Sequence, residues 1–93
     1  MARARRVDAT QAPIVEALRK IGAKVRSTAN VGDDFPDLCV GFQGRTILLE
    51  VKSAGQSLTK GQEAFAASWP GECHTVHSVD EALAVVIGEK AMA

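Results

Sequence analysis

Two acidic residues and a lysine near the middle of the chain have the types and spacing of a hydrolytic centre. Asp37 opens one apolar run, and Glu50 and Lys52 stand two residues apart near the end of the next. Oxygen ligands without a nearby histidine or cysteine favour Mg²⁺ or Mn²⁺ over Zn²⁺, and bound Mg²⁺ commonly takes one or two carboxylates together with a substrate phosphate. The expected chemistry is metal-assisted phosphodiester hydrolysis, with Lys52 orienting water or neutralising developing charge.

A hairpin would bring the two carboxylates together. Residues 36–42 and 45–52 are both rich in strand formers, and the Gln-Gly pair between them is typical of a tight turn. With two residues in the turn, counting outward pairs Asp37 directly with Glu50. Like charges facing each other on a sheet repel by roughly 0.2–1 kcal/mol, so the arrangement favours a cation between them.

Alternation along these strands divides their side chains between two faces. Asp37, Glu50 and Lys52 share one face, which is expected to be exposed and to carry the site. The other face is apolar and is expected to join the core, with Leu38, Val40, Phe42, Ile47, Leu49 and Val51. The competing interpretation is an edge hairpin with solvated charges and an aspartate that merely follows a turn proline.

Periodicity and turn residues predict the order α-β-β-β-α-β-α, an α/β fold. The expected elements are a helix capped by Thr10 and stopped by Gly22, strands over 23–28, 36–42 and 45–52, a helix from Thr59 toward Trp69, a strand over 73–77, and a last helix from a Ser78–Glu81 capping box to Gly88. One domain over residues 8–88 is expected, with a basic arm at 1–7 and a tail at 89–93.

Composition narrows the class of protein. No apolar run approaches the roughly 18 residues of a membrane span, and the arginine-rich start has no hydrophobic segment behind it, so a cytoplasmic protein is expected. Cys39 and Cys73 lack the paired spacing of a zinc site and are expected to be buried free thiols.

Two short runs resemble the PD-(D/E)xK motif of restriction-endonuclease-like nucleases: Phe-Pro-Asp ending at Asp37, and Leu-Leu-Glu-Val-Lys ending at Lys52. The Leu-Thr-Lys-Gly-Gln run ending at Gln62 and the run 76–82 are similar to stand-alone VRR-NUC domains of phages and bacteria. The likeness covers roughly residues 8–88. It implies an αβββαβ core with a mixed central sheet flanked by helices, followed by a C-terminal helix.

The same resemblance implies roles for individual residues. Asp37, Glu50 and the backbone carbonyl of Val51 would coordinate the metal, and Lys52 and Gln62 would lie near the attacking water. The implied enzyme is a Mg²⁺- or Mn²⁺-dependent endodeoxyribonuclease. By analogy with stand-alone members of the family, it would act on branched DNA or four-way junctions as a homodimer.

Two positions carry alternative interpretations. An acidic residue that the family often has on the first helix corresponds here to Gln11, whose neutral amide would act through water. Glu16 is the substitute, but it lies opposite the apolar stripe and can pair with Lys20 at i+4. Gln62 also completes a capping box that begins at Thr59, so its amide has a purely structural use.

Basic residues indicate where nucleic acid would bind. Residues 1–60 hold ten basic and six acidic residues, whereas 61–93 hold one and five, so the first part is expected to face a polyanion. Candidate phosphate contacts are Arg3, Arg5, Arg6 and Lys60. The basic arm has the alternative of a solubilising tail, and the main rival to the enzyme is a catalytically silent DNA-binding module of the same fold.

Overall fold

The computed structural model describes residues 9–88 of the chain. Its elements, in chain order, are α1 (Gln11–Lys20), β1 (Lys24–Ser27), β2 (Leu38–Phe42), β3 (Arg45–Val51), α2 (Lys60–Ser68), β4 (Glu72–Val76) and α3 (Val79–Ile87). This is the predicted order, and the fold is α/β with a C-terminal helix.

The four strands form one mixed sheet in the order β1-β2-β3-β4. The first three strands pair antiparallel, and β4 lies parallel to β3. A parallel neighbour requires a crossover connection, and the segment that contains α2 supplies it. The mixed sheet expected from the sequence is therefore confirmed.

The turn between β2 and β3 sets the register of the hairpin. Gln43 and Gly44 have φ angles of 49° and 83°, and positive φ at both central residues matches the right-handed twist of the strands. Phe42 faces Arg45 as predicted, and the ladder continues to the pair of Leu38 with Leu49. Strand β2 begins two residues later than expected.

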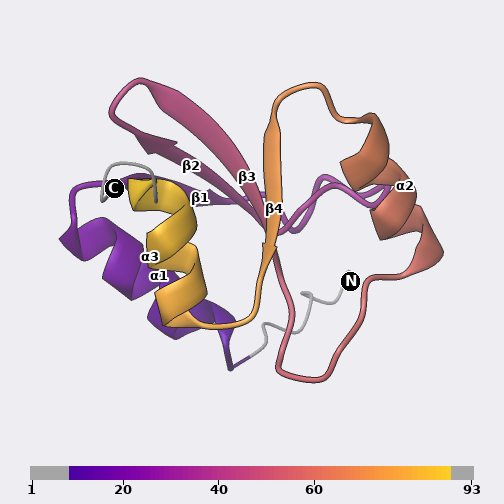
Figure 1. Cartoon of the computed structure of the whole chain (residues 1–93), viewed down its shortest axis with the longest axis horizontal. Coiled ribbons are helices and arrows are strands. Elements are labelled where there is room, and N and C mark those ends of the chain that lie inside the picture. The colour runs from indigo at the N-terminus through magenta and orange to yellow at the C-terminus, as the bar shows by residue number, and fades with distance from the viewer. Residues whose placement is uncertain (1–8, 89–93) are drawn as a thin grey trace.

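One face of the sheet packs against α1 and α3, which lie together on the same side in Figure 1. The apolar positions of α1, all four strands and α3 meet there in a single cluster. Its buried members are Ile14, Leu18, Ala23, Val25, Leu38, Val40, Ile47, Leu49, Val51, Val76, Ala82 and Val86. Phe42, expected to be in the core, is only partly buried against it.

Helix α2 stands apart from the other two helices, at the opposite end of the molecule in Figure 1, and has no buried residue. Phe35, in the loop before β2, contacts Phe65 and Trp69 edge-on, with ring centroids 5.4 and 6.0 Å away. From the same loop, the carboxylate of Asp34 packs against Gly61 where a Cβ atom would collide with it. Helix α2 therefore docks on a loop rather than on the core.

Two helix starts differ from the sequence prediction. Thr10 has helical φ and ψ angles and its side chain does not cap α1; its hydroxyl lies 3.3 Å from Ser53 Oγ instead. At α3, Ser78 accepts the amide of Glu81 as expected. The Glu81 carboxylate, however, accepts from the His77 amide at 2.8 Å, one residue before the position that a capping box uses.

The two cysteines are free thiols, as expected, but they are half-buried rather than fully buried. Across residues 9–88, no helix is long and apolar enough to cross a membrane.

Candidate functional site

Asp37 lies just before β2, and its Oδ2 accepts a hydrogen bond from the Val51 amide at 2.8 Å. In a continued ladder the partner of this amide would be the carbonyl of Pro36, which accepts the Thr28 hydroxyl at 2.7 Å. The amide donates to the Asp37 carboxylate instead, which fixes that carboxylate beside β3.

The carbonyl of Val51 points to the same side as its amide, because both groups of a residue in an antiparallel pair face one neighbour. It therefore faces the Asp37 side of β3. The residue that would donate to it in a continued ladder is Pro36, which has no N–H. The proline of the Pro-Asp pair thus keeps a carbonyl oxygen out of the backbone ladder.

Glu50 was expected on an exposed face, and this is wrong: only 6% of the residue is exposed, and it is the one buried charged residue within 9–88. Its Oε2 accepts from Gln62 Nε2 at 3.1 Å and lies 4.0 Å from Lys52 Nζ. A buried carboxylate is costly unless it is hydrogen-bonded or paired, and these groups offset that cost. The face opposite the core is therefore itself partly buried, and Leu48 is 4% exposed there.

Gln62 combines its two predicted uses. Its side-chain Oε1 accepts from the Thr59 backbone amide at 2.9 Å, and its backbone N–H donates to the Thr59 hydroxyl oxygen at 3.1 Å. The two bonds complete the capping box. Its side-chain Nε2 remains to bind Glu50. The capping box therefore orients the side-chain amide of Gln62 toward Glu50. Through this residue α2 contacts the candidate site.

Lys52 follows β3, and its side chain is 16% exposed. Its backbone amide donates to the Val76 carbonyl at 3.0 Å, which holds the residue against β4. The ammonium group is therefore kept near the Glu50 carboxylate while retaining a path to solvent. Such a cation can meet a substrate without leaving the protein surface.

The neighbouring strand contributes a residue that the sequence interpretation overlooked. Thr75 on β4 is paired with Glu50, so its side chain lies beside the carboxylate on the same face. One step along, Cys73 has a thiol pKa raised by burial and then by the negative charge of Glu50. Strand alternation alone could place Thr75 on a face, but no turn fixes the register of a parallel strand.

The donors present fit a hard divalent cation. Asp37 uses one oxygen for the Val51 amide, and nothing within residues 9–88 donates to the other. With the Glu50 carboxylate and the Val51 carbonyl, the set is entirely oxygen, which Mg²⁺ and Mn²⁺ prefer. No group of three His, Cys, Asp or Glu side chains in that range is arranged to hold a metal. Water and a substrate phosphate would have to complete the coordination.

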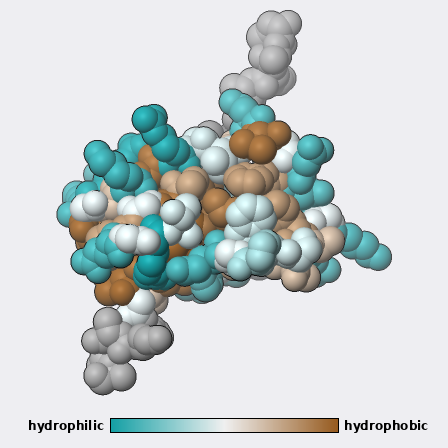
Figure 2. Space-filling view, turned by 90° about the horizontal axis from the view of Figure 1, so that it is seen from above, coloured by the Kyte–Doolittle hydropathy of each residue, from teal (hydrophilic) through white to brown (hydrophobic). Residues whose placement is uncertain are grey.

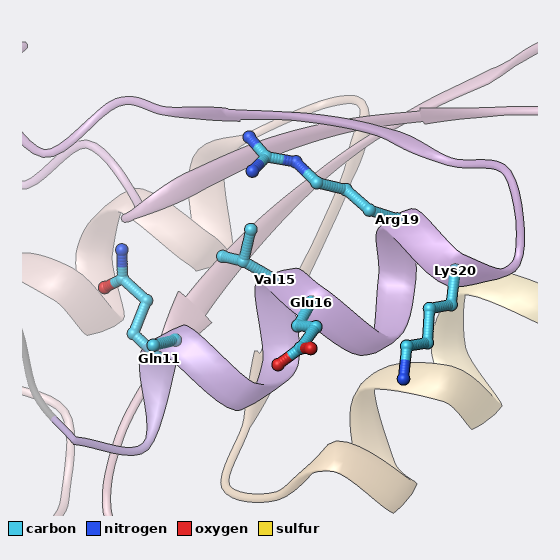
Figure 3. A pocket seen from close by; sticks show the side chains of 6 residues that line it. Gln11, Val15, Glu16, Arg19 and Lys20 are labelled. Carbon is cyan, nitrogen blue, oxygen red and sulfur yellow. The ribbon is translucent and has the colours of Figure 1, made fainter.

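Gln11 begins α1, and the 3.3 Å approach of Thr10 to Ser53 brings this end of the helix to the segment that follows Lys52. In Figure 3 the Gln11 amide points toward the strands, whereas Glu16 points away from them. Neither residue makes a hydrogen bond to Asp37 or Glu50 in the described range. The expected Glu16 pair with Lys20 is not among the ion pairs of residues 9–88 either.

The remaining candidates lie apart. Lys60 is the exposed first residue of α2. His74 lies 3.7 Å from Glu72 and His77 lies 3.1 Å from Glu81, so the two imidazoles have different partners. The arginines predicted to contact phosphates, Arg3, Arg5 and Arg6, lie outside the described residues.

Comparisons of the chain with protein-family models, with curated proteins and with solved structures find no match.

Proposed function

We propose that the chain is a Mg²⁺- or Mn²⁺-dependent endonuclease that hydrolyses DNA phosphodiester bonds. The observation that carries the proposal is the buried Glu50 carboxylate, hydrogen-bonded by Gln62 and 4.0 Å from the Lys52 ammonium, on the strand next to Asp37. On a solvated edge hairpin the Glu50 carboxylate would be exposed, because burying a charge costs free energy. The resemblance to the VRR-NUC nucleases agrees with this assignment, and the α/β fold is compatible with their core.

Each residue has a role that its contacts support. Asp37, Glu50 and the Val51 carbonyl would hold the ion, which when bound supplies Lewis-acid polarisation of a phosphoryl oxygen and activation of water. Lys52 offers its ammonium to the negative charge that grows on the phosphoryl oxygens in the transition state. Gln62 orients the Glu50 carboxylate through its Nε2 group. Gln11 would act through water.

Branched DNA is the substrate that we propose, and a homodimer is the acting form. One subunit carries one candidate site and can cut one strand, so paired cuts in a duplex or a four-way junction require two copies related by a two-fold axis.

The experiment that separates an enzyme from a silent DNA-binding module is Lys52→Ala. Single-turnover cleavage should fall about 10²–10³-fold, because one preorganised electrostatic contact is commonly worth that much in rate. Equilibrium DNA affinity should change far less, since the interaction strengthens mainly in the transition state. Lys52→Arg, which keeps the charge, is the matched control and should retain more activity.

The two rival outcomes are distinct. If binding collapses while the bound fraction cuts at the wild-type rate, Lys52 is only a phosphate contact. If wild-type protein binds DNA but cuts no substrate with either ion, the chain is a silent binding module.

A further inference from the structure

The face of the sheet that α1 and α3 leave uncovered carries basic residues beyond the candidate site. Lys24 and Arg26 alternate with buried Val25 on β1, so both side chains point to the face that Asp37 and Glu50 occupy. The amide of Thr28 donates to the Asp37 carbonyl at 2.8 Å, which continues the β1–β2 register to that residue. Arg26 therefore lies diagonally across from Asp37, a separation of roughly 7–8 Å between such positions.

Arg19 adds a third positive charge at the free edge of β1. Its Nη2 donates to the Val25 carbonyl at 2.9 Å, and Figure 3 shows the side chain reaching from α1 toward the strands. A hollow of about 420 Å³ lies at this edge and is lined by Arg19, Gly22, Ala23, Lys24, Val25 and Arg26. Three of these residues are basic and none is acidic.

A backbone amide also faces the free edge of β1. Because the Val25 carbonyl faces Arg19 rather than β2, the Val25 amide also faces the free edge. Figure 2, seen from above, shows hydrophilic and hydrophobic side chains mixed over that view of the molecule, with many hydrophilic side chains standing out at its margin. A ligand along the β1 edge would meet the cationic groups of Arg19, Lys24 and Arg26 together with the Val25 amide.

We propose that the β1 edge is a track for the DNA phosphate backbone, leading away from the candidate site through Arg26 and Lys24 toward Arg19. The inference rests on the proposed function for its substrate, and it assigns the positioning of the flanking strand to these residues. Cations that neutralise phosphates release condensed counterions, which gives sequence-independent affinity. Such contacts suit a nuclease that selects DNA by shape.

A second copy of the chain is the other natural occupant of a free strand edge. Antiparallel pairing of two β1 strands would place lysine and arginine side chains opposite one another, and like charges in that position are destabilising. Arg19 also occupies the Val25 carbonyl that such pairing would use. Charge therefore favours a polyanion over a second subunit.

The test is binding of a DNA duplex in EDTA, so that cleavage plays no part, across a range of salt concentrations. The double variant Lys24→Ala/Arg26→Ala should make the slope of log affinity against log salt shallower by up to about 1.8, since each phosphate contact contributes about 0.9. The exchange Lys24→Arg/Arg26→Lys should preserve the slope. Lys20→Ala is the matched control, because Lys20 points away from the strands in Figure 3 and lines a different hollow.

An unchanged slope in the double alanine variant, or a wild-type protein that does not bind DNA, would overturn the track. A change in sedimentation from dimer to monomer without a change in slope would show that the edge meets a second copy, and would overturn it as well. If the double alanine variant shows the shallower salt dependence but the wild-type protein cuts no DNA, the phosphate track is supported and the nuclease proposal fails.

Discussion

The helices at the two ends of the molecule are held by different physical means. At one end α1 and α3 cover one face of the sheet with a continuous cluster of buried apolar side chains. At the other end α2 buries no residue and is joined to the protein by an aromatic cluster of Phe35, Phe65 and Trp69, in which Phe65 stacks on Trp69 at 5.1 Å. The Gln62 bond to Glu50 is the polar link between them.

This difference divides the candidate site. Asp37, Glu50 and Val51 come from the hairpin, whose opposite face is packed in the core, whereas Gln62 comes from the lightly attached helix. Local openings occur first where few apolar side chains are buried. Changes that displace α2 should therefore leave the geometry of the strand residues intact. Changes that disrupt the strands should also disturb α2 and Gln62.

The core end should show the largest loss of stability. Leu18→Ala removes a side chain that is fully buried between α1 and the sheet, and such truncations cost about 2–5 kcal/mol. Denaturant unfolding measures the effect. Lys20→Ala, exposed on the same helix, should stay within about 0.5 kcal/mol of wild type. Equal losses in both variants would contradict the division between the two ends.

The polar link should come next. Gln62→Ala removes a donor to the buried Glu50 carboxylate, and hydrogen bonds to charged groups contribute about 1.5–3 kcal/mol. Gln56→Ala provides a comparison in an exposed loop, where the side-chain amide oxygen accepts from the Ser53 backbone amide, and should cost much less. The free energies of unfolding of the two variants, measured with denaturant in the absence of divalent ions, should differ clearly. A Gln62→Ala protein as stable as Gln56→Ala would show that the Gln62–Glu50 bond does not stabilise the fold.

The aromatic attachment should give the smallest global change and the most local one. Trp69→Ala removes two ring contacts, each worth about 0.5–1.5 kcal/mol, from a residue that is 37% exposed. Amide hydrogen exchange should accelerate in α2 and stay slow in β3. Ile87→Ala, an exposed apolar residue of α3, should leave exchange in α2 unchanged. Uniform acceleration throughout the protein would show that α2 is part of the core.

The sequence predicted the hairpin well because its determinants are local. Two turn residues with positive φ and an alternating apolar pattern set the register that carries Asp37 toward Glu50. The fold class followed from periodicity along each segment. The proline before Asp37 was part of the motif, but its effect on the ladder became visible only once the partner of each backbone group was known.

The sequence predictions that were wrong concern residues whose contacts lie far away in the chain. The burial of Glu50 depends on groups from α2 and β4, and no local pattern indicates that packing. Thr10 does not cap α1 because its own backbone angles are helical, and its hydroxyl lies near Ser53, 43 positions away. The basic alternation of β1 was present in the sequence, yet its relation to Asp37 requires the pairing of β1 with β2.

The most direct test of the central claim is cleavage of branched and duplex DNA by wild type and Asp37→Asn, with Mg²⁺ or Mn²⁺ and with EDTA. Asparagine keeps an oxygen that accepts from the Val51 amide, so the fold should persist while the ligand charge is lost. Thermal unfolding and metal-free DNA binding of both proteins check that. Wild type should nick DNA only when a divalent ion is present, and the variant should not nick it. Nicking by Asp37→Asn at the wild-type rate would contradict the metal-site assignment.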